Sequence, residues 1–231
     1  TEISMDEIND AIDRVLAGPE KKNRVMSEKR KTLVAYHEAG HALVGALMPD
    51  YDPVQKISII PRGRAGGLTW FTPSEDRMES GLYSRSYLQN QMAVALGGRL
   101  AEEIIFGEEE VTTGASNDLQ QVARVARQMV TRFGMSDRLG PVALGRQNGG
   151  GVFLGREIAS DRDFSDETAA AIDEEVRNLV EQAYRRAKDV LVGNRHVLDQ
   201  LAQMLVEKET VDADELQNIL ANNDVKMAAL A

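Results

Sequence analysis

The chain has 231 residues, of which 42% are hydrophobic, enough for one large or two small globular domains with an apolar core. Its 37 acidic and 27 basic residues give a formal net charge of -10, so we expect no nucleic-acid surface, which would need a basic face. It contains no cysteine, which excludes disulfides, a cysteine nucleophile and thiolate metal ligands. Any metal ion must be held by histidine and carboxylate groups.

The N-terminal segment predicts a short amphipathic helix followed by a charged linker. Residues 4–7 form a capping box and residues 18–19 end the helix, and between them lies an apolar stripe of Ile8, Ile12, Val15 and Leu16. Because the chain begins at Thr1 without an initiator methionine or a signal-like segment, we expect it to be a piece of a longer protein. The longest apolar run, residues 42–48, is too short to cross a bilayer, so we expect no membrane contact by this piece.

The most informative stretch is His37-Glu38-Ala39-Gly40-His41, within a helix predicted to run from an N-cap at Ser27 to about Met48. On a helix this spacing places both imidazoles on one face, where they can bind one zinc ion with Glu38 beside it, the HExxH arrangement of metallopeptidases. The second half of the helix is apolar nearly all round, which predicts burial, and unpartnered polar groups are costly to bury. Metal coordination is one compensation. The alternative is that the histidines bond to nearby carbonyls and the glutamate to an arginine.

Two short β-strands are predicted after this helix. Residues 54–60 are rich in β-branched side chains, and a turn-rich connection leads to a second strand at residues 67–72, so the two should pair as a hairpin. The free edge of the second strand is a candidate site for binding an extended peptide, formed by Gly67, Leu68, Thr69, Trp70 and Phe71. The alternative is that this strand only packs a small sheet.

Helices dominate the rest of the chain. A polar loop is expected at residues 75–80, followed by a long helix from about Ser84 to Phe106 that is interrupted by Gly97-Gly98. Glycine costs about 1 kcal/mol in a helix interior, so we expect the pair to allow close approach of another backbone, most simply that of the HExxH helix.

A loop at residues 107–114 leads to a helix after Ser116, with Asp118 pointing inward from its first turn and a predicted buried stripe of Leu119, Val122, Ala126, Met129, Val130 and Phe133. Residues 134–163 are glycine-rich and predict a long loop. Three helices should follow, one capped at Ser165, one at about residues 197–207 and one at residues 212–221. The remaining histidine, His196, is expected to be an exposed helix-end residue rather than a ligand.

A catalytic zinc site needs a third protein ligand and an open position. The extended metzincin pattern would require glycine at position 44 and histidine at position 47, where this chain has Val44 and Leu47, so that class is excluded. Thermolysin-like enzymes take a glutamate from a helix that soon follows, but the only acids between His41 and Glu75 are two aspartates in a loop. The remaining inward-facing candidates, which the spacing leaves open, are Glu102, Glu103 and Asp118.

These motifs resemble, in their order along the chain, the peptidase domain of the FtsH family of membrane-anchored, ATP-dependent zinc proteases. The resemblance extends from about residue 27 to residue 221. It rests on the HExxH stretch, on Gly97-Gly98-Arg99 with Ala101-Glu102-Glu103, and on Thr113-Gly114-Ala115-Ser116-Asn117-Asp118-Leu119. Within the family, the residues most similar to cyanobacterial and chloroplast members are Gly66-Gly67-Leu68-Thr69-Trp70-Phe71 and Leu82-Tyr83-Ser84-Arg85-Ser86-Tyr87.

The resemblance implies a mainly α fold, a helical zinc-metallopeptidase domain with a small β-hairpin or sheet beside the HExxH helix. It implies one Zn²⁺ per chain, held by His37, His41 and Asp118, with Glu38 as the catalytic base of peptide-bond hydrolysis. Glu102 or Glu103 would then orient a ligand imidazole through its free ring N–H.

The resemblance also places residues 1–26 at the end of an upstream ATPase module and residues 27–231 in the peptidase domain, with ATP used only through the missing module. Expected substrates are unfolded, damaged or unassembled proteins, including membrane proteins. The expected assembly is a homo-oligomer, a hexameric ring, or a hetero-oligomeric ring with paralogues. This soluble domain would belong to a membrane-anchored protein and lie on the cytoplasmic or stromal side of a thylakoid or plasma membrane.

Two rival interpretations belong to other classes of protein. A structural zinc module would be a closed, cysteine-rich site, and this chain has no cysteine. A metal-free helical scaffold or oligomerisation domain would carry the HExxH residues by coincidence. Stoichiometric zinc in the purified protein distinguishes the enzyme from the scaffold.

Overall fold

The computed structural model describes residues 26–63, 65–144 and 164–228, together with positions 11, 14, 15, 18 and 19. Most of the predicted N-terminal helix and linker, and residues 145–163 of the predicted loop, lie outside the described residues. Within the described part of the chain, no helix combines the length and the apolar character needed to cross a bilayer.

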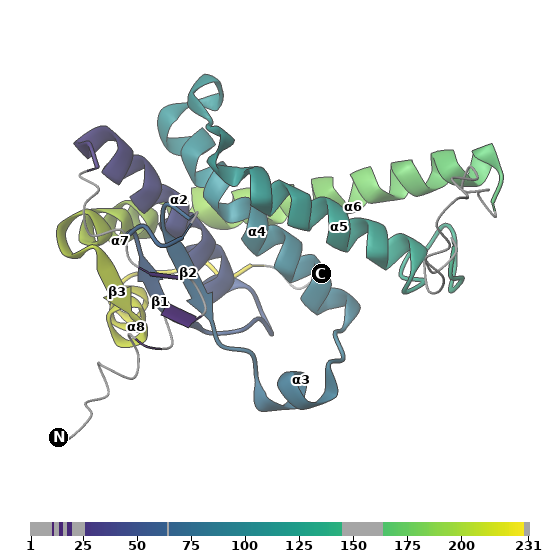
Figure 1. Cartoon of the computed structure of the whole chain (residues 1–231), viewed down its shortest axis with the longest axis horizontal. Helices are drawn as coiled ribbons and strands as arrows, with labels where there is room; N and C mark the ends of the chain where they lie inside the picture. The colour runs from purple at the N-terminus through teal and green to yellow at the C-terminus, as the bar shows by residue number, and fades with distance from the viewer. Residues whose placement is uncertain are drawn as a thin grey trace.

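The HExxH helix, α2 (Glu28–Leu47), has the predicted extent and the predicted buried second half, and it lies at the centre of the fold. It packs against α4 (Arg85–Phe106) and α7 (Arg195–Lys208), while α6 (Asp166–Gly193) packs mainly on α4. The helix α5 (Ser116–Thr131) runs beside α4 and α6 and extends with α6 to one side of the molecule (Figure 1). The side chain of Ser27 accepts a hydrogen bond from the Arg30 N–H and so caps α2 as the sequence predicts.

A three-stranded antiparallel sheet lies on the other side of the molecule, beside α7 and α8 (Ala213–Ala221) (Figure 1). The predicted hairpin is confirmed, because β1 (Val54–Ser58) pairs with β2 (Leu68–Phe71). The third strand, β3 (Thr210–Asp212), pairs with the other edge of β1 and was not predicted. At three residues it is too short to give an alternating pattern. The strand order β2-β1-β3 leaves β2 at an edge of the sheet.

Two local predictions are wrong. Residues 75–80 form a short helix, α3 (Glu75–Ser80), instead of a loop. None of its residues is buried, so it has no apolar periodicity to detect, although the acids of its first turn and Gly81 at its C-cap, with φ of 61°, favour a helix there. The expected loop at residues 107–114 also contains 3₁₀ turns, η1 (Glu108–Glu110) and η2 (Thr113–Ala115).

The buried stripe of α5 is shorter than predicted. Val122, Ala126, Met129 and Val130 are buried, but Leu119 and Phe133 are 40% and 47% exposed. Leu119 lies in the first turn of α5 and Phe133 lies beyond its last residue. Both therefore lie outside the stretch of the helix that is buried.

The glycine pair of α4 brings two helix backbones together, as expected. A Cβ atom at Gly97 would lie 2.7 Å from the Gly40 carbonyl oxygen, and a Cβ at Gly40 would lie 2.4 Å from that of Gly97. Only residues without a side chain permit this approach. The contact sets α4 directly against the HExxH stretch of α2.

Candidate metal centre

The two histidines of α2 point their Nε2 atoms toward each other. Nδ1 of His41 hydrogen-bonds to the Val94 carbonyl at 2.8 Å, and Nδ1 of His37 hydrogen-bonds to Oε1 of Glu102 at 2.7 Å. Because each ring uses Nδ1 in this way, both Nε2 atoms are available, and they lie 3.1 Å apart. The alternative that nearby carbonyls satisfy the histidines therefore accounts for one nitrogen of His41 and leaves both Nε2 atoms to be explained.

Asp118, in the first turn of α5, is the third group to reach this point. Its Oδ2 lies 3.6 Å from Nε2 of His37 and 3.7 Å from Nε2 of His41. The three ligand atoms lie within 4.8 Å of one another. In tetrahedral coordination with bonds of about 2.0–2.2 Å, neighbouring ligand atoms are about 3.3–3.6 Å apart, so the donor set fits a zinc ion with small adjustments.

The two glutamates of α4 have different surroundings. Glu102 is fully buried, with one carboxylate oxygen accepting from His37 and the other accepting from the Thr112 N–H at 2.8 Å. Glu103 instead accepts hydrogen bonds from the Tyr184 hydroxyl and the Lys188 ammonium group of α6. Of these two alternatives for orienting a candidate ligand imidazole, Glu102 contacts His37, whereas Glu103 contacts side chains of α6.

Gly98 leaves the space beside the two Nε2 atoms open. A Cβ atom at this position would lie 2.5 Å from Nε2 of His41 and 2.6 Å from Nε2 of His37. Any side chain here would push against both imidazoles. The two glycines therefore have different contacts. Gly97 lies against the backbone of α2, and Gly98 lies against the imidazoles of His37 and His41.

Glu38 is 6% exposed and lies between α2 and β2. Its Oε2 accepts a hydrogen bond from the Thr69 hydroxyl at 2.9 Å. Burial raises the pKa of Glu38 to about 7, against the opposing effects of His37 and Thr69. A carboxyl group with this pKa can both accept and release a proton near neutral pH.

The charges around the imidazoles favour a cation. Burial lowers the pKa of both histidines, but at His37 the nearby carboxylate of Asp118 and the hydrogen bond to Glu102 outweigh burial and raise its pKa. Burial and the positive charge of His37 lower the pKa of His41. The carboxylates of Asp118 and Glu102, which favour a proton on His37, would also favour a metal ion beside the two rings.

The three candidate ligands line a cleft of about 870 Å³. Its lining includes Leu33 and Val34 of α2, the aromatic rings of Tyr51 and Phe71, and part of β2. The predicted edge residues Gly67, Leu68, Thr69 and Phe71 line this cleft, whereas Trp70 does not. Trp70 has Lys56 of β1 over its ring instead.

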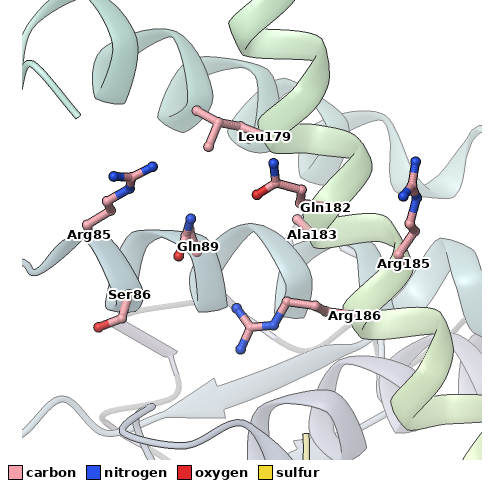
Figure 2. A pocket seen from close by; sticks show the side chains of 8 residues that line it. All are labelled: Arg85, Ser86, Gln89, Leu179, Gln182, Ala183, Arg185 and Arg186. Atoms are coloured by element: carbon pink, nitrogen blue, oxygen red, sulfur yellow. The ribbon is translucent and has the colours of Figure 1, made fainter. Parts of the chain in front are cut away.

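A second hollow of about 650 Å³ lies between α4 and α6 (Figure 2). Its described lining includes Arg85, Arg185 and Arg186 but no histidine or carboxylate. These described side chains include none of the ligands that bind zinc, and the arginines carry positive charge. His196, the remaining histidine, is exposed in the first turn of α7, as predicted.

Sequence reasoning missed several partners of the site. Val94, Thr112 and Thr69 contact His41, Glu102 and Glu38, in that order. Two of these contacts use the backbone, which leaves no trace in residue type. The third is made by a threonine whose position in a strand already explains its presence in the sequence.

Comparison with known proteins gives concordant matches. The model of Peptidase family M41 matches residues 24–219. A Synechocystis protein named ATP-dependent zinc metalloprotease FtsH 3 is 90% identical over 230 residues, covering 100% of this chain and 37% of the relative. An FtsH protein of Synechococcus is 69% identical over 227 residues, 98% of this chain and 35% of the relative. The chloroplastic FTSH 5 of Arabidopsis thaliana is 64% identical over 226 residues, 98% of this chain and 32% of the relative. The chain thus spans about a third of the length of these relatives.

Proposed function

The chain belongs to peptidase family M41, and from this premise we propose that it is the zinc-dependent endopeptidase domain of an ATP-dependent protease. The observation that carries the proposal is the convergence of His37, His41 and Asp118 from two helices onto one point of the cleft. The function of a metal-free scaffold would not require these three ligand atoms to converge beside Gly98.

In this proposal His37, His41 and Asp118 would hold one zinc ion at the side of the cleft. Bound there, zinc supplies Lewis-acid polarisation of the scissile carbonyl and a lowered pKa for a water molecule. Glu102 holds the ring of His37 in the tautomer whose Nε2 can bind the metal, and the Val94 carbonyl does the same for His41.

Glu38 is the proposed general base. It accepts a proton from the attacking water and passes it to the leaving amine. Its position directly after His37 and its contact with Thr69 support this role, because they hold the carboxylate beside the metal ligands.

The proposed substrates are unfolded, damaged or unassembled polypeptides, including membrane proteins. Support comes from β2, which is an edge strand of the sheet and forms part of the wall of the cleft. An extended peptide can add to such an edge through backbone hydrogen bonds that do not depend on its sequence. This mode of binding suits a protease that must degrade many different unfolded chains.

The wider context is proposed from the family. Residues 1–26 would belong to the end of an ATPase module and residues 27–231 to the peptidase domain, and the family match to residues 24–219 supports the second assignment. The relatives are named ATP-dependent, so we propose that ATP hydrolysis in that module drives substrate into the cleft. We further propose hexameric rings, of one chain or with paralogues, on the cytoplasmic or stromal side of a plasma or thylakoid membrane.

Metal content and proteolysis of the purified chain test the central proposal. We expect about one zinc per chain and cleavage of unfolded casein that stops on chelation and returns with zinc. Glu38→Gln should retain zinc and lose proteolysis by on the order of a hundredfold or more. Glu28→Gln, an exposed acid in the first turn of the same helix, is the matched control and should retain full activity.

Different failures have different meanings. A folded wild-type chain without stoichiometric zinc would indicate a metal-free scaffold. Zinc retained together with normal casein cleavage by Glu38→Gln would refute the role of the base while leaving the metal site in place. Light scattering of the chain after size exclusion tests the ring, and a stable monomer would contradict self-assembly by this domain alone.

A further inference from the structure

The side chain of Thr69 makes a contact that a substrate-binding strand does not require. Its Oγ1 lies 2.9 Å from Oε2 of Glu38 and 3.2 Å from the backbone oxygen of Glu38. A hydroxyl group has one proton to donate, and the carboxylate is both the nearer and the stronger acceptor. The hydrogen bond therefore joins the middle of β2 to the carboxylate of α2.

Gly67 completes a slot around the same carboxylate. A Cβ atom at Gly67 would lie 2.7 Å from both Cγ and Oε1 of Glu38 and 2.9 Å from the Ser58 carbonyl oxygen. Gly67 lies directly before β2 and Thr69 lies within it, and both are in contact with this carboxylate. Gly67 leaves space for the carboxylate of Glu38, and Thr69 donates a hydrogen bond to it.

The slot restricts the orientation of Glu38. Threonine is β-branched and stiff at χ1, so its hydroxyl is presented from a fixed place on β2. Register adds to this rigidity, because Thr69 is paired with Ile57, a fully buried residue of β1. A glutamate has three rotatable side-chain bonds, and without this partner its carboxylate could turn away from the metal ligands while remaining in the cleft.

We propose that Thr69 is a positioning residue, whose hydroxyl holds Oε2 of Glu38 and so fixes the orientation of the carboxylate that accepts the proton during peptide hydrolysis. The inference rests on the proposed function of Glu38 as the base. It means that β2, the proposed substrate-binding strand, also sets the orientation of the Glu38 carboxylate. The side chain of Thr69 acts on Glu38, whereas its backbone belongs to the strand edge.

Thr69→Val tests this role because it keeps the shape and removes the hydroxyl. With an internally quenched peptide as substrate, we expect kcat to fall roughly 10- to 100-fold with KM and zinc content unchanged, since misplacing a catalytic group by about 1 Å has an effect of this size. Thr69→Ser retains the hydroxyl and should keep most of kcat. Thr72→Val is the matched control, because Thr72 follows the same strand but donates to Gln55 on the exposed side. It should behave as wild type.

The outcomes separate this inference from the proposed function. Wild-type kcat for Thr69→Val, measured beside an inactive Glu38→Gln, overturns the positioning role and leaves the base in place. A raised KM with unchanged kcat also overturns it and assigns Thr69 to substrate binding alone. Equal losses in Thr69→Val and Thr69→Ser overturn it too, because serine keeps the hydroxyl that the proposal holds responsible. An active Glu38→Gln removes the proposed base itself, and the inference fails with it.

Discussion

Two hollows of similar size lie on opposite faces of α4, and only one of them contains groups that converge. In the cleft of about 870 Å³, two imidazoles and a carboxylate meet within 4.8 Å. In the hollow of about 650 Å³ between α4 and α6, the guanidinium groups of Arg85, Arg185 and Arg186 lie well apart (Figure 2). Arg85 pairs with Asp137 and Arg185 pairs with Glu181.

The comparison shows that the volume of a hollow does not identify a functional site in this fold. A functional site is identified instead by side chains that converge on the same groups. In the cleft, side chains from α2, α4, α5 and β2 each hold another functional group in place. In the second hollow, two of the three arginines make ion pairs at the exposed surface, which contribute little. Matched substitutions in the two hollows should therefore have very unequal effects.

The largest effect is expected from Asp118→Ala. Removing one of three ligands should abolish stoichiometric zinc and reduce casein cleavage by roughly a thousandfold or more, with helical content unchanged. The control is Asp137→Ala at the rim of the second hollow, where an exposed aspartate pairs with Arg85. It should retain zinc and activity. Elemental analysis and a casein assay measure both, and a zinc-loaded, active Asp118→Ala would exclude this residue as a ligand.

Gly98→Ala should remove zinc without unfolding the protein. The new Cβ would lie within 2.6 Å of both Nε2 atoms, so the imidazoles must move, while alanine itself favours the helix by about 1 kcal/mol. Gly97→Ala is the neighbouring control, and its Cβ would meet the backbone of Gly40 instead. We expect Gly98→Ala to lose zinc at a near-normal melting temperature and Gly97→Ala to lose melting temperature first. The same response from both variants would contradict this division.

Glu102→Gln should weaken zinc binding by about ten- to a hundredfold. Both oxygens of Glu102 accept hydrogen bonds, one from His37 and one from the Thr112 N–H, and glutamine offers only one oxygen for the two donors. Glu103→Gln is the adjacent control, since Glu103 binds Tyr184 and Lys188 on α6. Competition with a chromophoric chelator measures both affinities. Equal affinities for the two variants would show that Glu102 does not support the metal.

The sequence predicts the parts of this site that repeat at helical spacing. His37 and His41 are four residues apart on a helix whose burial follows from its apolar second half, and the structure has both features. The mainly α fold, the β1–β2 hairpin and the contact at Gly97 follow from patterns of the same local kind. Each can be derived from a short stretch, because the cause lies within one or two turns of chain.

Contacts between distant segments could not be derived in this way. Spacing left Glu102, Glu103 and Asp118 open, because only the packing of α5 and α6 against α4 decides which carboxylate faces the imidazoles. The family resemblance points to Asp118, whose Oδ2 lies within 3.7 Å of both Nε2 atoms, whereas Glu102 contacts Nδ1 of His37. The strand β3 and the helix α3 were missed for a different reason, since neither carries enough buried residues to leave a pattern.

The smallest effect is expected in the second hollow, with Arg85→Gln. The guanidinium group of Arg85 makes a bidentate pair with Asp137, but both side chains are largely exposed, so water replaces the interaction at little cost. We expect wild-type zinc content and kcat, and a melting temperature within about 2 °C of wild type. A kinetic assay and a thermal melt suffice to measure this. A tenfold loss of activity would show that the α4–α6 face acts on the cleft through α4, and the contrast between the two hollows would then no longer hold.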